Sequence, residues 1–275
     1  MAECTLEGVA KRLKMLSKHC DLDCPDEVKA FIVKLKRSSG YKRNLADAYA
    51  HYVVWNNLYW EKPKFVREEK AIRVPSTEHV NQLIACSGPK YSMILSVFKE
   101  TGARPCELER VRLRDVDLEK GVIYLPSRKG SKGRAKQLSS NTVAMLKRYL
   151  TSKKFELDDY IFPSSKAMTK SFVRHRNKLA KKLQDATIKT IRLYDFRHYY
   201  ATMLYHKTKD ILYVKEQLGH RRLENTLVYT HLVDFHDDEW VSAVARTVEK
   251  ARELVEAGFE YICDVDGAKL FRKRK

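Results

Sequence analysis

The segment RLYDFRHYYAT, residues 192–202, says most about how this chain folds. Tyr194 and Arg197 are three residues apart, so their side chains share one face of a helix. Ala201 and Leu204 continue that face with helical spacing, which predicts a helix that is partly buried. A buried arginine needs an anionic partner, and a phosphate group would serve. The segment therefore predicts a helix that carries a cation for an anionic substrate.

Two short motifs follow this helix. The first is LGHRR at residues 218–222, in which Gly219 stands where a helix C-cap glycine belongs. The second contains Tyr229, nine residues after His220. Tyr229 by itself is weak evidence for chemistry, because the chain has 15 tyrosines and most tyrosines serve packing.

The segment TGARPCEL, residues 101–108, contains a second candidate phosphate ligand. Pro105 suits the first turn of a helix, which places Arg104 at the helix start beside free backbone N–H groups. Such a position favours binding of a phosphate. The alternative is a structural ion pair between Arg104 and Glu107.

A turn rich in glycine and lysine, residues 127–133, separates two predicted strands. Lys129 lies at the tip of this hairpin. From there a lysine can reach into a DNA groove, or donate a proton to a departing oxygen. The alternative is a solvated lysine without a specific role.

The composition favours a polyanionic partner. Lys and Arg number 54 and Asp and Glu 35, so the formal net charge is +19. Nucleic acid is the leading candidate, because basic side chains displace the counterions condensed on its backbone. A basic protein without such a partner is the alternative. Hydrophobic residues make up 44% of the chain, which argues against wholesale disorder.

No membrane or metal function is expected. The sequence contains no run of about 18 apolar residues, and its N-terminus lacks the layout of a secretory signal. We therefore expect a cytoplasmic, nucleoid-associated protein whose six cysteines are thiols. His19, Cys20 and Cys24 lie close together, but no second pair with zinc-ligand spacing accompanies them.

The pattern along the chain predicts a mainly α protein with a small antiparallel β-sheet (α+β). The expected parts are a small helical domain (1–62), a linker (63–74), a second domain (75–240), and a C-terminal helix with a basic tail (241–275). Strands are expected at 111–118, 122–126 and 135–138. Later helices are expected at about 169–184, 195–207, 209–218 and 238–257. The last of these helices packs either on its own domain or on a neighbouring protomer.

These motifs together resemble the tyrosine recombinase, or lambda-integrase-like, family. The family shows an arginine in a Gly-x-Arg-x-x-Glu-Leu context, a hairpin lysine, a His-x-x-Arg box, a Leu-Gly-His box and a nucleophilic tyrosine. The matching residues, from about Thr101 to Leu232 and in the family's order, are Arg104, Lys129, Arg197, His220 and Tyr229. One position departs, because Tyr194 stands where the family usually has histidine. Tyrosine or lysine there resembles integrases of archaeal plasmids and viruses.

The resemblance implies a mechanism. Tyr229 would attack a backbone phosphate and form a 3′-phosphotyrosine. Arg104 and Arg197 would clamp the phosphate oxygens, His220 would donate a hydrogen bond, and Lys129 would protonate the leaving 5′-oxygen. No metal or cofactor is required, because the arginines supply the positive charge.

Two questions stay open at the site. A phenol with a pKa near 10 is a poor base, although Tyr194 can still donate a hydrogen bond to phosphate. The base for Tyr229 is unassigned, with His220, Tyr194 and the phosphate itself as options.

The implied partners are double-stranded DNA with specific attachment sites and a homotetramer on two duplexes, with the two domains clamping the DNA. Integration or excision of a mobile element is the first reading of the function. A recombinase that resolves chromosome dimers is the main alternative. A type IB topoisomerase and a catalytically dead DNA-binding protein are weaker alternatives.

Overall fold

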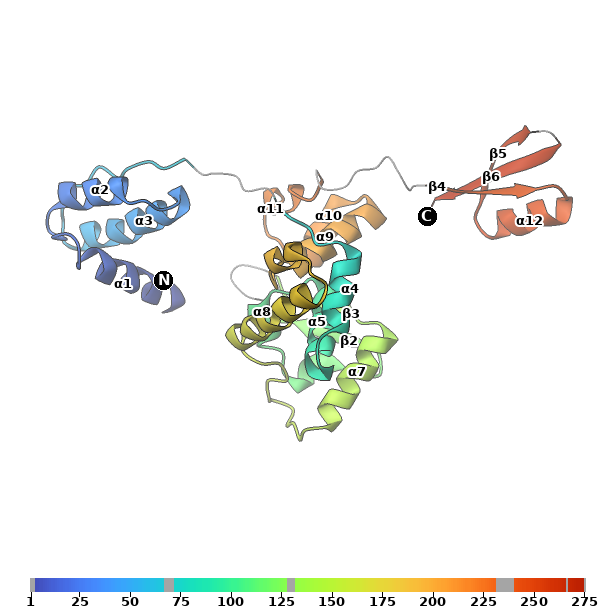
Figure 1. Cartoon of the computed structure of the whole chain (residues 1–275), viewed down its shortest axis with the longest axis horizontal. Helices are drawn as coiled ribbons and strands as arrows, with labels where there is room; N and C mark the ends of the chain where they lie inside the picture. Colours follow the sequence, from blue (N-terminus) through green and yellow to red (C-terminus); the bar gives the residue numbers. More distant parts are fainter. Residues whose placement is uncertain (1–2, 67–71, 128–131, 231–239, 266, 275) are drawn as a thin grey trace. The chain divides into compact units, whose positions relative to one another are not determined.

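The computed structural model describes residues 3–66, 72–127, 132–230, 240–265 and 267–274. The chain divides into two compact units, Met1–Ala71 and Ile72–Lys275, and this boundary falls inside the range expected for the linker. Helices dominate both units, and two small antiparallel sheets accompany them in the second (Figure 1). The mainly α fold class is therefore confirmed. Among the described residues, no helix is long and apolar enough to cross a membrane.

The first unit is a bundle of three helices, α1 (Glu3–Leu16), α2 (Pro25–Lys34) and α3 (Ser39–Trp55). Pro25 opens α2, and the Ser38 side chain accepts a hydrogen bond from the first turn of α3. The buried core is formed by Leu16, Cys20, Val28, Ile32, Leu45, Ala46, Tyr49 and Val53. Helix α3 ends at Trp55, and the side chains of Trp55 and Tyr59 are exposed.

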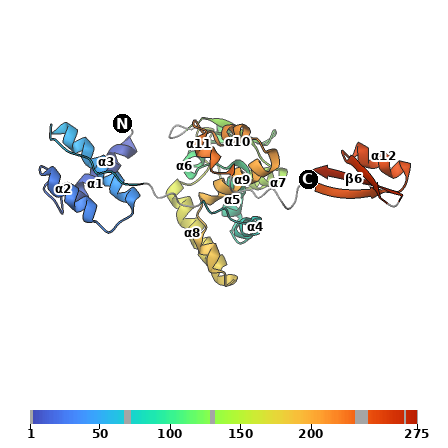
Figure 2. The same cartoon turned by 90° about the horizontal axis from the view of Figure 1, so that it is seen from above.

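The helices of the second unit between residues 77 and 227 are arranged around α5 (Figure 2). In chain order they are α4 (Thr77–Ala85), α5 (Pro89–Thr101), α6 (Pro105–Leu108), α7 (Ser140–Thr151), α8 (Ser165–Lys182), α9 (Asp195–Thr208), α10 (Ile211–Leu218) and α11 (Glu224–Leu227). Helix α5 is buried around most of its circumference, and it contacts α4, α7 and α9. This central position fixes the C-terminal end of α5, which becomes part of the candidate site.

A three-stranded antiparallel sheet in the order β1-β2-β3 lies in the same unit. Its strands are β1 (Val116–Asp117), β2 (Val122–Leu125) and β3 (Arg134–Gln137). The expected strand 111–118 was wrong in length, because a 3-10 turn at Leu113–Asp115 precedes β1. In that turn the Asp115 carboxylate accepts a hydrogen bond from the Arg112 backbone N–H at 2.9 Å, which bends the chain.

The C-terminal segment corrects a second expectation. Instead of a helix over 238–257 and a basic tail, the described residues form β4 (Trp240–Ala245), α12 (Val248–Glu256), β5 (Glu260–Val265) and β6 (Ala268–Arg274). The strands pair antiparallel in the order β4-β6-β5. Phe271, inside the expected tail, is buried with Ala245 and Leu254. Side-chain burial alternates along β4, with Ser242 and Val244 exposed and Ala245 buried, as expected of a half-buried strand. The Thr247 side chain caps α12.

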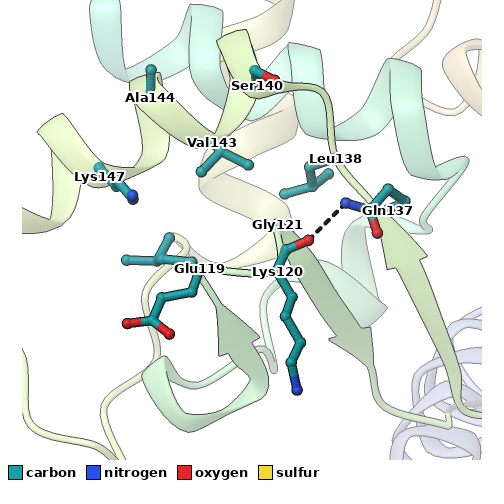
Figure 3. Close-up of a pocket in the computed structure, with 10 residues that line it drawn as sticks. Glu119, Lys120, Gly121, Gln137, Leu138, Ser140, Val143, Ala144 and Lys147 are labelled. Atoms are coloured by element: carbon teal, nitrogen blue, oxygen red, sulfur yellow. Dashed lines mark hydrogen bonds between the residues drawn. The ribbon is translucent and has the colours of Figure 1, made fainter.

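A surface pocket of about 310 Å³ lies between α7 and the β1–β2 turn (Figure 3). The Gln137 side-chain amide donates a hydrogen bond to the backbone oxygen of Lys120 at 2.7 Å and closes one side of it. None of the residues predicted to carry chemistry lines this pocket. The site described below is therefore a separate feature of the unit.

Candidate active site

Arg197 lies on α9 with a side chain that is only 1% exposed. Its Nη1 donates a hydrogen bond to the Gly102 backbone oxygen at 2.6 Å, and its Nη2 donates to the Leu218 backbone oxygen at 2.7 Å. These two carbonyls stand at the C-terminal ends of α5 and α10. The C-terminal end of a helix carries partial negative charge and favours cations. Two helix ends therefore hold the guanidinium where a carboxylate would otherwise be needed.

The glycines in the two motifs explain how these helix ends approach Arg197. Gly102 and Gly219 are the C-caps of α5 and α10, and both adopt the left-handed conformation. A Cβ atom at Gly102 would lie 2.4 Å from the Tyr200 ring, and one at Gly219 would lie 2.8 Å from the backbone oxygen of Lys132. Both positions therefore require glycine. The prediction of Gly219 as a C-cap glycine is confirmed.

Arg104 precedes α6 and is paired with Glu107. Its Nη1 donates a hydrogen bond to Glu107 Oε1 at 2.7 Å, and its backbone N–H donates to Oε2 of the same carboxylate at 2.9 Å. Arg134 on β3 donates a further bond to Oε2 at 2.9 Å. The structural pairing considered for Arg104 is thus present, but Glu107 is shared with a second arginine. The Arg104 side chain also keeps 21% of its surface exposed.

The charged side chains of this cluster shift one another's pKa values. Burial alone would raise the pKa of Glu107, but hydrogen bonds and charge from Arg134, with help from Arg104, lower it to about 2. Burial, followed by repulsion from Arg104, lowers the pKa of Arg197 to about 10. All three arginines remain cationic at neutral pH. Three guanidinium groups and one carboxylate therefore leave a positive surplus, as a phosphate site requires.

His220 lies directly after Gly219 and is 8% exposed. A hydrogen bond of 2.8 Å joins its Nδ1 to the Thr226 hydroxyl on α11. Burial lowers its pKa to about 3, and the charges of Arg197, Arg104 and Arg134 add to this effect. His220 is therefore neutral at physiological pH. When Thr226 donates to Nδ1, the proton is on Nε2, which is then free to bond a phosphate oxygen.

Tyr229 follows α11 and is 2% exposed. Its ring packs in an apolar cluster with Ala201, Val214 and Leu218, between α9 and α10. Its hydroxyl lies 3.1 Å from Nδ1 of His198. Burial raises the pKa of Tyr229 to about 12, although Arg197 acts in the opposite direction. The phenol is therefore fully protonated at neutral pH in this conformation.

Tyr194 lies immediately before α9 and is 39% exposed. Its ring meets His198 edge-on, with ring centroids 5.2 Å apart. It also interacts electrostatically with Arg104 and Arg197. The residue that departs from the family pattern thus lies beside the guanidinium groups, with an exposed side chain.

Lys129 lies outside the described residues. Lys132, in the same turn, is described and contacts the site, because its backbone N–H donates a hydrogen bond to the Gly219 backbone oxygen at 3.2 Å. The structure thus brings together Arg104, Tyr194, Arg197, His220 and Tyr229, whose mutual electrostatic shifts link them into one group.

Sequence reasoning missed four residues of this site, namely Arg134, Lys136, His198 and Thr226. Lys136 is 4% exposed, and its Nζ donates to the Tyr200 hydroxyl at 2.9 Å and to the Gln217 side-chain oxygen. Burial, followed by repulsion from Arg134, lowers the pKa of Lys136 to about 7. Alternation along β3 was the available signal for Lys136, because it is the buried residue in a strand with exposed neighbours. The sequence carried no comparable signal for His198, apart from its position next to Arg197.

Within the described part of the chain, no group of three or more His, Cys, Asp or Glu side chains is arranged to hold a metal ion. The charge that faces a substrate comes from guanidinium groups, which stay ionised and donate in pairs to phosphate oxygens.

The comparisons with known proteins agree with this geometry. The model of the phage integrase family matches residues 75–236. Tyrosine recombinase XerA of Saccharolobus solfataricus is 26% identical over 227 residues, which cover 82% of this chain and 75% of that protein. Tyrosine recombinase XerA of Pyrococcus horikoshii is 24% identical, with 81% of this chain and 78% of that protein covered.

A solved structure extends the likeness to almost the whole chain. The Tn1549 transposon integrase in complex with transposon right-end DNA superposes with a TM-score of 0.64 at 17% identity, covering 94% of each chain. At this identity the match concerns the fold alone. A lambda integrase dimer bound to a core site has a TM-score of 0.62 at 14% identity, covering 86% of this chain and 91% of that one.

Proposed function

This chain belongs to the phage integrase family of tyrosine recombinases, enzymes that cut and rejoin DNA, and we propose that Tyr229 is its nucleophile. The resemblance stated from the motifs is thereby confirmed, and the substrate is double-stranded DNA. The observation that carries the assignment of Tyr229 is its place among Arg197, Arg104 and His198 at the meeting point of α9, α10 and α11.

The proposed reaction follows from the contacts of each side chain. The Tyr229 hydroxyl oxygen attacks phosphorus, the 5′-oxygen leaves, and a 3′-phosphotyrosine forms. Arg104 and Arg197 stabilise the negative charge on the non-bridging oxygens, and His220 donates a hydrogen bond from Nε2. Lys129 protonates the 5′-oxygen. The reverse attack by a 5′-hydroxyl rejoins the strands without a cofactor, because the phosphotyrosine keeps the bond energy.

Arg197 also has to reach the phosphate. Its Nη1 and Nη2 donate to the two helix ends, while its Nε is buried without a hydrogen-bond partner among the described residues. Each terminal nitrogen of a guanidinium carries a second N–H, so donors remain after both carbonyls are satisfied. Arg197 therefore combines a fixed position with free donors, which is what preorganised charge stabilisation requires.

The biological setting that we propose is integration or excision of a mobile element at specific attachment sites. Tyr194 in place of the usual histidine supports it, because the same replacement is a feature of the plasmid and virus integrases that the chain resembles. The chain would act as a tetramer on two duplexes, in the nucleoid of the cytoplasm. Resolution of chromosome dimers is the alternative that the test below addresses.

The test is covalent capture. The protein is incubated with a nicked suicide duplex, and the adduct is resolved on a denaturing gel. We expect an adduct with the native chain and none with Tyr229→Phe, whereas the exposed Tyr124→Phe serves as the matched control and keeps adduct formation. An adduct of undiminished yield with Tyr229→Phe would refute the assignment.

Mapping the covalent phosphate over a library of duplexes then separates the two settings. Cleavage at a site shared by an element and its chromosomal target supports the mobile-element function. Cleavage confined to one chromosomal site that recombines with its own copy supports dimer resolution. Relaxation of supercoils without strand exchange would indicate a topoisomerase instead.

A further inference from the structure

The phenolic proton of Tyr229 needs an acceptor before the oxygen can attack phosphorus. Arginine cannot serve, because the guanidinium group does not give up its proton in proteins. His220 is engaged elsewhere, since its Nδ1 is bonded to Thr226. The inference below rests on the proposed role of Tyr229 as the nucleophile, and it concerns the step that this role leaves open.

His198 is the base that contacts the phenol. Its Nδ1 lies 3.1 Å from the Tyr229 hydroxyl, within hydrogen-bonding distance, and the two rings are tilted with centroids 5.8 Å apart. The hydroxyl belongs to a protonated phenol and donates, so Nδ1 accepts and the imidazole proton is on Nε2. Among the described residues, the structure gives the Tyr229 hydroxyl this one side-chain hydrogen bond.

The position of His198 on α9 places its imidazole between Tyr194 and Tyr229. His198 lies four residues after Tyr194, so both side chains project from the same face of the helix, and their rings meet edge-on. An imidazole that the family pattern places at 194 is absent here. The imidazole one helical turn further along the same face contacts the nucleophile directly.

We propose that His198 is the general base that accepts the proton of Tyr229 during strand cleavage. As the bond between the Tyr229 oxygen and phosphorus forms, the phenolic proton moves to Nδ1 of His198 and yields an imidazolium. The bond between phosphorus and the 5′-oxygen breaks, and that oxygen takes a proton from Lys129. In the rejoining step the imidazolium returns its proton to the departing phenolate.

The surroundings keep His198 in the form that this role requires. Burial is the largest influence and lowers the pKa of His198 below its ordinary 6.5, and the positive charges of Arg192 and Arg197 act in the same direction. The Asp195 carboxylate opposes them. The rings of Tyr194 and Tyr229 also contact the imidazole. His198 is therefore a neutral proton acceptor at physiological pH.

The first test replaces the base by a group of similar shape. His198→Asn keeps a hydrogen-bond acceptor near the place of Nδ1 but cannot take up a proton. We expect the rate of adduct formation on suicide DNA to fall by about 100- to 10,000-fold, with DNA binding within twofold. His206→Asn, an exposed histidine on the same helix, is the matched control and should cleave at the native rate.

The pH profile distinguishes a base from a positioning residue. Cleavage by the native chain should decline as the pH falls through the pKa of His198, below 6.5, because the imidazole is then protonated. His198→Asn should lack this acidic limb. His198→Ala gives a second route, since added imidazole should restore a substantial part of its cleavage and should leave His198→Asn unchanged.

A substrate with sulfur in place of the bridging 5′-oxygen separates the two proton transfers. A thiolate leaves without protonation, so this substrate should rescue Lys129→Ala and should not rescue His198→Asn. Native-like cleavage by His198→Asn, or its full rescue by the sulfur substrate, would overturn the proposal. Cleavage by Tyr229→Phe would instead refute the nucleophile assignment, so the two failures are distinguishable.

Discussion

The guanidinium groups on the two sides of the site are stabilised in different ways. Arg104 and Arg134 share the Glu107 carboxylate, which is fully buried. Arg197 is more deeply buried, and it donates hydrogen bonds to the backbone carbonyls at the ends of α5 and α10. A carboxylate cancels a full charge, whereas helix ends supply only partial charges. The side built on Arg197 therefore keeps more of its positive charge for a phosphate.

This difference also teaches why Glu107 is needed. Two arginines around one carboxylate are fixed in orientation by its two oxygens, so Arg104 is preorganised while a net positive charge remains. A second carboxylate would remove that charge and compete with the phosphate. The predictions below perturb each side in turn.

The largest effect on activity should follow from Arg197→Ala. Loss of a preorganised donor typically costs about 2.7–4 kcal/mol in transition-state stabilisation, or roughly 100- to 1000-fold in rate. DNA binding should stay mostly intact, because the chain has 54 Lys and Arg residues and its affinity for the DNA backbone would be spread over many of them. Adduct formation on suicide DNA and a binding titration measure the two quantities. The control is Arg114→Ala, which replaces an exposed arginine. Unreduced cleavage by Arg197→Ala would contradict the conclusion that Arg197 stabilises the charge on the phosphate.

Glu107→Gln should disrupt the ion pairs that the carboxylate forms with Arg104 and Arg134, and should destabilise the fold. Removal of one partner from a buried ion pair costs about 3–5 kcal/mol. The pKa of Glu107 is lowered from 4.5 to about 2, so its contribution is present above pH 4.5 and is lost as the pH falls through about 2. Urea unfolding of the native chain and the variant should therefore differ most near neutral pH and converge at low pH.

The exposed Glu256→Gln provides the control for that comparison, with little effect expected at any pH. A constant difference between the native chain and Glu107→Gln from neutral pH down to about pH 2 would show that the carboxylate charge does not stabilise the cluster.

A smaller effect, visible in stability alone, is expected for Lys136→Met. The pKa of Lys136 is lowered from 10.5 to about 7, so the folded state binds fewer protons than the unfolded state between these values. The native chain should therefore gain stability relative to the variant as the pH rises through this window. The gain should be about 2 kcal/mol between pH 7.5 and 9. Urea titrations at both pH values measure it, and a pH-independent difference would contradict the lowered pKa of the buried Lys136.

Several parts of the site follow from local sequence rules. Pro105 places Arg104 before a helical turn, and Gly219 ends a helix, because caps act over a few residues. The helix that carries Arg197 was predicted at 195–207 and spans Asp195–Thr208. The C-terminal segment was misread, because apolar residues in 238–257 fit helical spacing while Phe271 and Ala245 pack together from distant positions.

The sequence by itself determined the family and the order of the motifs, and it predicted the residues that we propose to clamp a phosphate. Only the tertiary structure decided which carbonyls hold Arg197, that Arg134 shares Glu107, and that His198 contacts Tyr229. The physical reason is the separation in sequence over which each kind of interaction acts. Caps and helical periodicity act between residues a few positions apart, whereas these contacts join residues 27, 95 and 31 positions apart and exist only after the helices and the sheet have packed.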